Sequence, residues 1–91
     1  MQPVRDALPR AVAALIRDAP LSPGKTDFAW RVAVGPTVHR NTAVRLEQGV
    51  LLVDTTSRQW ADEVRRSARV ILARLQILLG ESAITRIEVR A

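Results

Sequence analysis

The sequence has no cysteine and no tyrosine among its 91 residues, and only one histidine, one phenylalanine and two tryptophans. The lack of cysteine excludes disulfide bonds, a thiol nucleophile and a cysteine-based zinc site, and it fits a reducing compartment. A single histidine, His39, cannot build a histidine metal site, and a Ser-His-Asp triad would depend on it alone. We expect His39 to act as a capping or hydrogen-bonding group near a helix end.

Several motifs of catalysis and membrane insertion are also missing. The four glycines are scattered and form neither a Walker motif nor a dinucleotide-binding fingerprint, and no serine lies in a G-x-S-x-G elbow. No apolar run approaches the roughly 20 residues of a membrane span, and the first ten residues lack the apolar segment of a signal peptide. The sequence therefore predicts a cytoplasmic protein without enzymatic activity, cofactor, metal or membrane partner.

What the sequence does contain is an excess of arginine. Thirteen arginines and one lysine face nine acidic residues, so the formal net charge is +5 and the basic residues are spread along the chain. Guanidinium groups suit bidentate phosphate contacts, which favours an anionic partner. A basic surface without such a partner is the alternative.

The segment around which the chain is organised runs from residue 49 to residue 80. Residues 50–53 form a short branched apolar run that predicts a buried strand. Thr56 or Ser57 then offers an N-cap hydroxyl, with Gln59 at the capping-box spacing from Thr56. From there an apolar period of 3.6 predicts one continuous helix of about six turns, ended by Gly80.

The flanking segments complete a small α+β domain. We expect a helix over 4–19, a proline-rich connector, a helix over 25–34 and strands over 42–47 and 84–90, with 37–41 left as a loop or a helical turn. The predicted order is α-α-β-β-α-β in a two-layer domain, with a three-stranded sheet packed on helices. Residues 1–91 form this single domain, of which 1–24 are the N-terminal helix and connector and 25–91 the main body. The inward apolar residues of the first two helices are predicted to be Leu8, Val12, Leu15, Ile16, Phe28 and Val32.

The predicted core combines the two tryptophans with the apolar residues of the strand and the long helix. We expect Trp60 to be largely buried between the long helix and the sheet, in contact with Leu51 or Val53. A base-stacking role for either tryptophan is the weaker alternative, since so few aromatic residues are present. The predicted core residues are Trp30, Leu51, Val53, Trp60, Val64, Ile71 and Leu75.

Two groups of arginines are candidates for nucleic-acid binding. On the long helix, Arg58, Arg65 and Arg69 fall within about 40° of one another in helical projection, beside Arg66. On the outer face of the sheet, Arg45, Arg86 and Arg90 form the second group. Either group could follow a phosphate backbone. The alternative is a solvated helix face in which Asp62 pairs with nearby arginines.

A second apolar stripe on the long helix, made of Val70, Ala73 and Ile77, indicates another packing surface. We expect the first helix of the same chain to cover it. The alternative is a docking surface for another protein, for which the open edge of the sheet is a second candidate.

The residues also suggest a family. The segments Trp30-x-x-x-Val34-Gly35, Val38-His39, Leu46-x-x-Gly49-x-Leu51-x-Val53 and Ser57-x-x-Trp60-Ala61-x-Glu63-Val64 resemble, in combination, the pattern of bacterial DciA-type proteins. The likeness spans about residues 28–89, but the G-x-x-G loop of ordinary KH domains is absent, as is the longer basic extension that these proteins usually carry.

The resemblance implies a KH-like fold, weak affinity for single-stranded DNA and contact with the replicative DNA helicase. A protein-interaction adaptor of unknown partner, with an incidental basic surface, remains the alternative function. The oligomeric state is left open.

Overall fold

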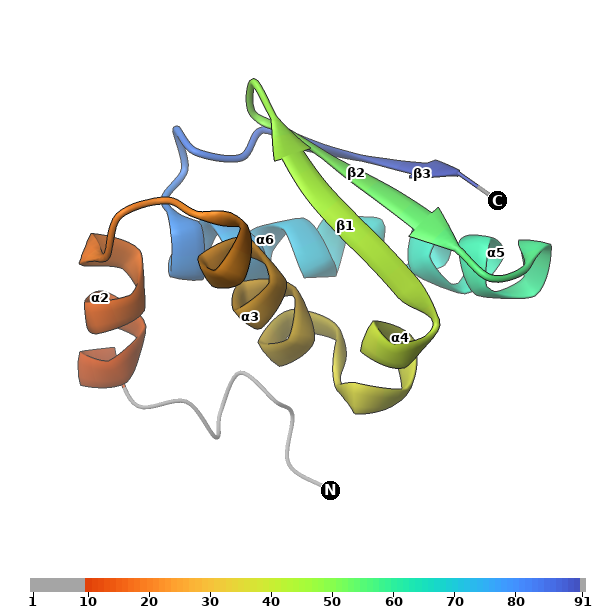
Figure 1. The fold of residues 1–91 in the computed structure, drawn as a ribbon, viewed down its shortest axis with the longest axis horizontal. Coiled ribbons are helices and arrows are strands. Elements are labelled where there is room, and N and C mark those ends of the chain that lie inside the picture. Colours follow the sequence, from red (N-terminus) through yellow and green to blue (C-terminus); the bar gives the residue numbers. More distant parts are fainter. Residues whose placement is uncertain (1–9, 91) are drawn as a thin grey trace.

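The computed structural model describes residues 10–90, and in these a mixed three-stranded sheet packs on a layer of helices (Figure 1). The α+β class predicted from the sequence is confirmed. Predictions that fall on residues 1–9, including Leu8, lie outside the described residues, as does the side chain of Val12. The elements are α2 (Arg10–Asp18), α3 (Pro23–Val34), α4 (Pro36–Arg40), β1 (Thr42–Glu47), β2 (Val50–Thr55), α5 (Arg58–Arg66), α6 (Ala68–Leu79) and β3 (Arg86–Arg90).

The sheet has the order β1-β2-β3. β1 and β2 form an antiparallel hairpin whose turn places Gln48 and Gly49 at φ 49° and 82°. Two successive positive φ values are typical of a type I′ turn, in which glycine avoids the steric cost of the second position. β3 pairs with β2 in parallel, as the crossover through α5 and α6 requires.

The core lies between the sheet and the helices. Leu51 and Val53 of β2 are fully buried and pack with Trp30, Val64, Ile71 and Leu75. The opposite side of the sheet is not covered by any described helix: Arg45, Arg86 and their neighbours in alternate positions are exposed. One face of the sheet therefore remains available to partners.

The prediction of one continuous helix over residues 57–79 is wrong, because the structure interrupts this helix at Ser67. α5 ends at Arg66 and α6 begins at Ala68, and Ser67 has φ −103° and ψ 7°. The two halves differ in their main neighbours: α5 packs on β2 and β3, whereas α6 packs mainly on α2 and α3 and also touches β3. The interruption lets each half turn its apolar side toward its own neighbours.

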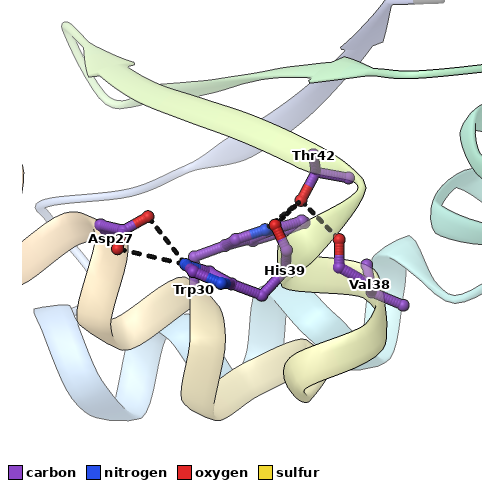
Figure 2. Close-up of polar contacts among 5 residues, drawn as sticks. All are labelled: Asp27, Trp30, Val38, His39 and Thr42. Atoms are coloured by element: carbon purple, nitrogen blue, oxygen red, sulfur yellow. Dashed lines mark hydrogen bonds and ion pairs between the residues drawn. The ribbon is translucent and has the colours of Figure 1, made fainter.

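Trp30 and Trp60 have different environments, which corrects the prediction that both are core residues. Trp30 is fully buried, and its Nε1 donates a hydrogen bond to Thr42 Oγ1 at 2.8 Å (Figure 2). Trp60 is only partly buried. On α5 the buried residues are Ala61 and Val64, and the Trp60 side chain projects from the flank of their arc, about 100° from Ala61.

Two further apolar residues predicted to face inward are exposed. Phe28 is 48% exposed and Leu15 is 73% exposed. α3 buries Thr26, Ala29, Trp30 and Ala33, and Phe28 projects about 160° from Thr26 around the helix axis. α2 instead buries Ala13, while Ile16 is partly buried against the core.

Candidate nucleic-acid interface

The basic surface of α5 begins at its N-terminal cap. Ser57 has extended backbone angles, and its Oγ accepts a hydrogen bond from the backbone N–H of Trp60 at 3.3 Å. This fixes Ser57, and not Thr56, as the N-cap residue. Arg58, Arg65 and Arg66 follow on α5 and are exposed, and the equally exposed Arg69 lies beyond the interruption, on α6. A helical projection over one continuous helix therefore does not describe where Arg69 lies.

Two of these arginines are engaged within the chain. The Arg65 guanidinium donates to the carbonyl oxygen of Val89 at 3.0 Å and to Asp62 Oδ1 at 3.4 Å, so it ties α5 to the end of β3. Arg66 pairs with Glu63 at 3.2 Å. The solvated-face alternative predicts that Asp62 pairs with nearby arginines, and Asp62 does pair with Arg65, whereas Arg66 pairs with Glu63 instead. Exposed i,i+3 pairs of this kind add little stability.

The other two arginines have no such engagement. Neither Arg58 nor Arg69 forms a salt bridge or a side-chain hydrogen bond with residues 10–90. The four arginines of this group, less Asp62 and Glu63, leave a local excess of two positive charges. We call this set of six residues the α5 basic surface.

On the outer face of the sheet, each of the three predicted arginines pairs with a carboxylate. Arg45 pairs with Glu47 at 2.7 Å, Arg90 pairs with Asp54 at 3.1 Å, and Arg86 pairs with Glu88. Three arginines and three carboxylates give this face no net charge. It is therefore less suited than the α5 basic surface to follow a phosphate backbone, whose binding depends on uncompensated cations.

Trp60 lies beside the α5 basic surface. It lines a shallow depression of about 370 Å³ with Val38, Gln59 and Glu63. A partly exposed indole ring can stack on a base. In helical projection Trp60 lies near Glu63 and about 120–160° from Arg58, Arg65 and Arg66.

The second apolar stripe of the sequence is open, so the prediction that the first helix covers it is wrong. Val70 is 50% exposed and Ile77 is 54% exposed, and Ala73 between them is also exposed. The described part of the first helix, α2, packs against α6 near Leu78 and leaves Val70 and Ala73 uncovered. The exposure of this stripe makes it a candidate contact surface.

His39 lies in the last turn of α4, where its Nε2 contacts both carboxylate oxygens of Asp27, at 3.0 and 3.1 Å (Figure 2). This confirms its expected polar role near a helix end. Thr42 Oγ1, which accepts from Trp30, donates to Val38 O at 2.8 Å and so joins α3, α4 and β1.

Within residues 10–90 no group of three or more His, Cys, Asp or Glu residues could hold a metal ion. No helix in that range is both long and apolar enough to cross a membrane.

Comparison with known proteins gives one match. The family model described as "Dna[CI] antecedent, DciA" matches residues 3–89, nearly the whole chain. No curated protein and no solved structure matches the chain. The match agrees with the resemblance carried by Trp30, Gly49, Leu51 and Trp60, and it extends that resemblance toward the N-terminus. The chain belongs to the DciA family of replicative helicase loaders, which is an accessory family and not a catalytic one.

Proposed function

We propose that this chain is a cytoplasmic DNA-replication accessory domain that binds single-stranded DNA weakly through the α5 basic surface and contacts the replicative DNA helicase. The observation that supports the DNA contact most strongly is the pair Arg58 and Arg69, whose guanidinium groups are exposed and engaged by no described residue. A phosphate oxygen can accept a charge-assisted hydrogen bond from such a guanidinium group without breaking an existing contact.

The local charge implies a weak interaction. Two uncompensated charges would neutralise about two phosphates, so log K should fall with log[salt] with a slope near −1.4 for a single strand. Stacking on Trp60 would add about 1–3 kcal/mol for one base. We therefore expect micromolar or poorer affinity at low salt.

Fluorescence anisotropy with a labelled single strand tests this proposal. The double variant Arg58→Glu/Arg69→Glu should abolish binding without unfolding the chain. Both changes place a carboxylate in the first turn of a helix, where the helix dipole favours it. The matched control is Arg45→Glu/Arg86→Glu on the sheet face, which changes the net charge equally and should leave most of the binding. Equal losses in the two variants would contradict the assignment to α5.

The helicase contact is assigned to the open stripe of Val70, Ala73 and Ile77. Support comes from the exposure of this stripe together with membership in a helicase-loader family. A specific interface takes about 800 Å² from each partner, so the contact would extend beyond these three residues. Val70→Glu should remove co-elution with the helicase, whereas Leu15→Glu, an equivalent change at an exposed apolar residue of α2, should not. Co-elution of both variants would contradict this location.

A further inference from the structure

A groove lies between α2, α3 and α6, which pack together at one end of the molecule (Figure 1). Its floor is apolar and consists of Ala13 of α2, Ala33 of α3 and Leu78 of α6, all buried. The cavity that these helices leave between them has a volume of about 430 Å³. This volume lies within the range of about 300–1,000 Å³ that is typical of ligand sites.

Three arginines line the groove. Arg10 and Arg17 come from α2, and Arg74 comes from α6. Arg17 has a distant carboxylate neighbour, Asp18, at 4.0 Å, whereas Arg10 and Arg74 form no salt bridge with any residue in the range 10–90. Three arginines less one aspartate leave a local excess of two positive charges around an apolar floor.

Arg74 is held in place but only partly compensated. One guanidinium nitrogen, Nη1, donates to the carbonyl oxygen of Ala33 at 2.9 Å, which fixes the side chain across the contact of α3 and α6. Its Nε is buried and has no hydrogen-bond acceptor among the described residues. A buried cationic donor without an acceptor is unfavourable, so a carboxylate brought to this guanidinium would stabilise it.

The apolar surface continues beyond the groove along α6. Ile77 lines the groove and also belongs to the exposed stripe that continues through Ala73 to Val70. From Val70 to Ile77 the helix advances about 10 Å. A compact small molecule would fill the cavity and leave this extension uncovered, whereas an elongated occupant would cover both.

We infer that this groove binds a helical peptide segment of a partner protein, with apolar side chains one turn apart flanked by carboxylates. An amphipathic helix that binds with its apolar face in a groove places its anchoring side chains at positions i, i+3 or i+4, and i+7. Its apolar side chains would pack on Ala33, Leu78 and Ile77. Its carboxylates would meet Arg10, Arg17 and Arg74 in charge-assisted hydrogen bonds. The inference goes beyond DNA binding and holds whichever protein supplies the segment.

The test uses a labelled synthetic peptide of about 16 residues, long enough to form a helix, with leucines at i, i+4 and i+7 and glutamates beside them. Two control peptides replace the leucines by alanine or the glutamates by glutamine. Anisotropy with the full chain should show saturable binding of the first peptide and loss of binding with either control. Chemical-shift changes should fall on α2 and α6.

Arg10→Glu/Arg17→Glu should weaken peptide binding about tenfold or more, and the sheet-face variant Arg45→Glu/Arg86→Glu should leave it unchanged.

Four outcomes would overturn the inference. The first two are a lack of saturable peptide binding and an equal loss of peptide binding in the two double variants. The other two are chemical-shift changes confined to the sheet face or α5, and self-association in sedimentation measurements with a second copy of the chain in the groove. Arg58→Glu/Arg69→Glu should keep full peptide binding. Failure of the DNA proposal and failure of this inference are therefore separate results.

Discussion

At the scale of single residues, the two tryptophans show how differently one side-chain type is used. Trp30 is enclosed by the core, and its ring N–H begins a hydrogen-bond chain through Thr42 Oγ1 to Val38 O. These hydrogen bonds give the Trp30 ring N–H an acceptor and the Thr42 hydroxyl both a donor and an acceptor. They also fix the start of β1 against α3 and α4. Trp60, by contrast, is only partly buried, and the residues that α5 buries are Ala61 and Val64.

Alanine substitution of each tryptophan should therefore have unequal effects on stability. Trp30→Ala should lower the free energy of unfolding by about 3–5 kcal/mol, because it opens a cavity in the core and leaves Thr42 without its donor. Trp60→Ala should cost less than about 2 kcal/mol, since only part of its ring is removed from water. Urea unfolding of the two variants measures both values, and a larger loss for Trp60→Ala would contradict the observed burial.

The sequence predicted the burial of Trp30 but placed Trp60 in the core as well. Both residues lie close to apolar arcs in helical projection, and a projection does not show how far a helix extends past the sheet that it covers. The exposed position of Phe28 has the same origin, because the small residues Thr26, Ala29 and Ala33 allow α3 to pack closely on a different face.

At the scale of the elements, two serines at helix starts provide a matched comparison. Ser57 Oγ accepts the backbone N–H of Trp60 and caps α5, whereas Ser67 makes no side-chain capping bond at the start of α6. Ser57→Ala should destabilise the fold by about 1 kcal/mol, and Ser67→Ala should change it by less than about 0.5 kcal/mol. Thermal unfolding of both variants checks this difference, and equal shifts in Tm would show that Ser57 does not cap α5.

Most elements of the fold could be predicted from local signals. The strand predicted over 42–47 coincides with β1, and the helix predicted over 25–34 ends where α3 ends, directly before Gly35 and Pro36. Alternation and breakers act over a few residues, so such signals can be recognised locally. The interruption at Ser67 could not be predicted in this way. The apolar period continues across it, and only the different packing partners of α5 and α6 explain the change of direction.

At the scale of the whole molecule, ion pairing decides which arginines remain available. From residue type alone, Arg45, Arg86 and Arg90 are equivalent to Arg58 and Arg69, and in the structure all five are exposed. The structure pairs the first three with carboxylates on the same sheet face and leaves the last two unengaged among residues 10–90. The candidate site could thus be predicted as two groups, and a choice between them required the side-chain contacts.

The central claim is a direct contact between this chain and the replicative DNA helicase, and calorimetric titration of the purified helicase at low and moderate salt tests it most directly. A contact centred on Val70, Ala73 and Ile77 is partly apolar, so its heat should persist at the moderate salt that screens exposed charges and releases DNA. Val70→Glu should remove the heat, and Leu15→Glu should not. Absence of heat for the unmodified chain at both salt concentrations would contradict the claim.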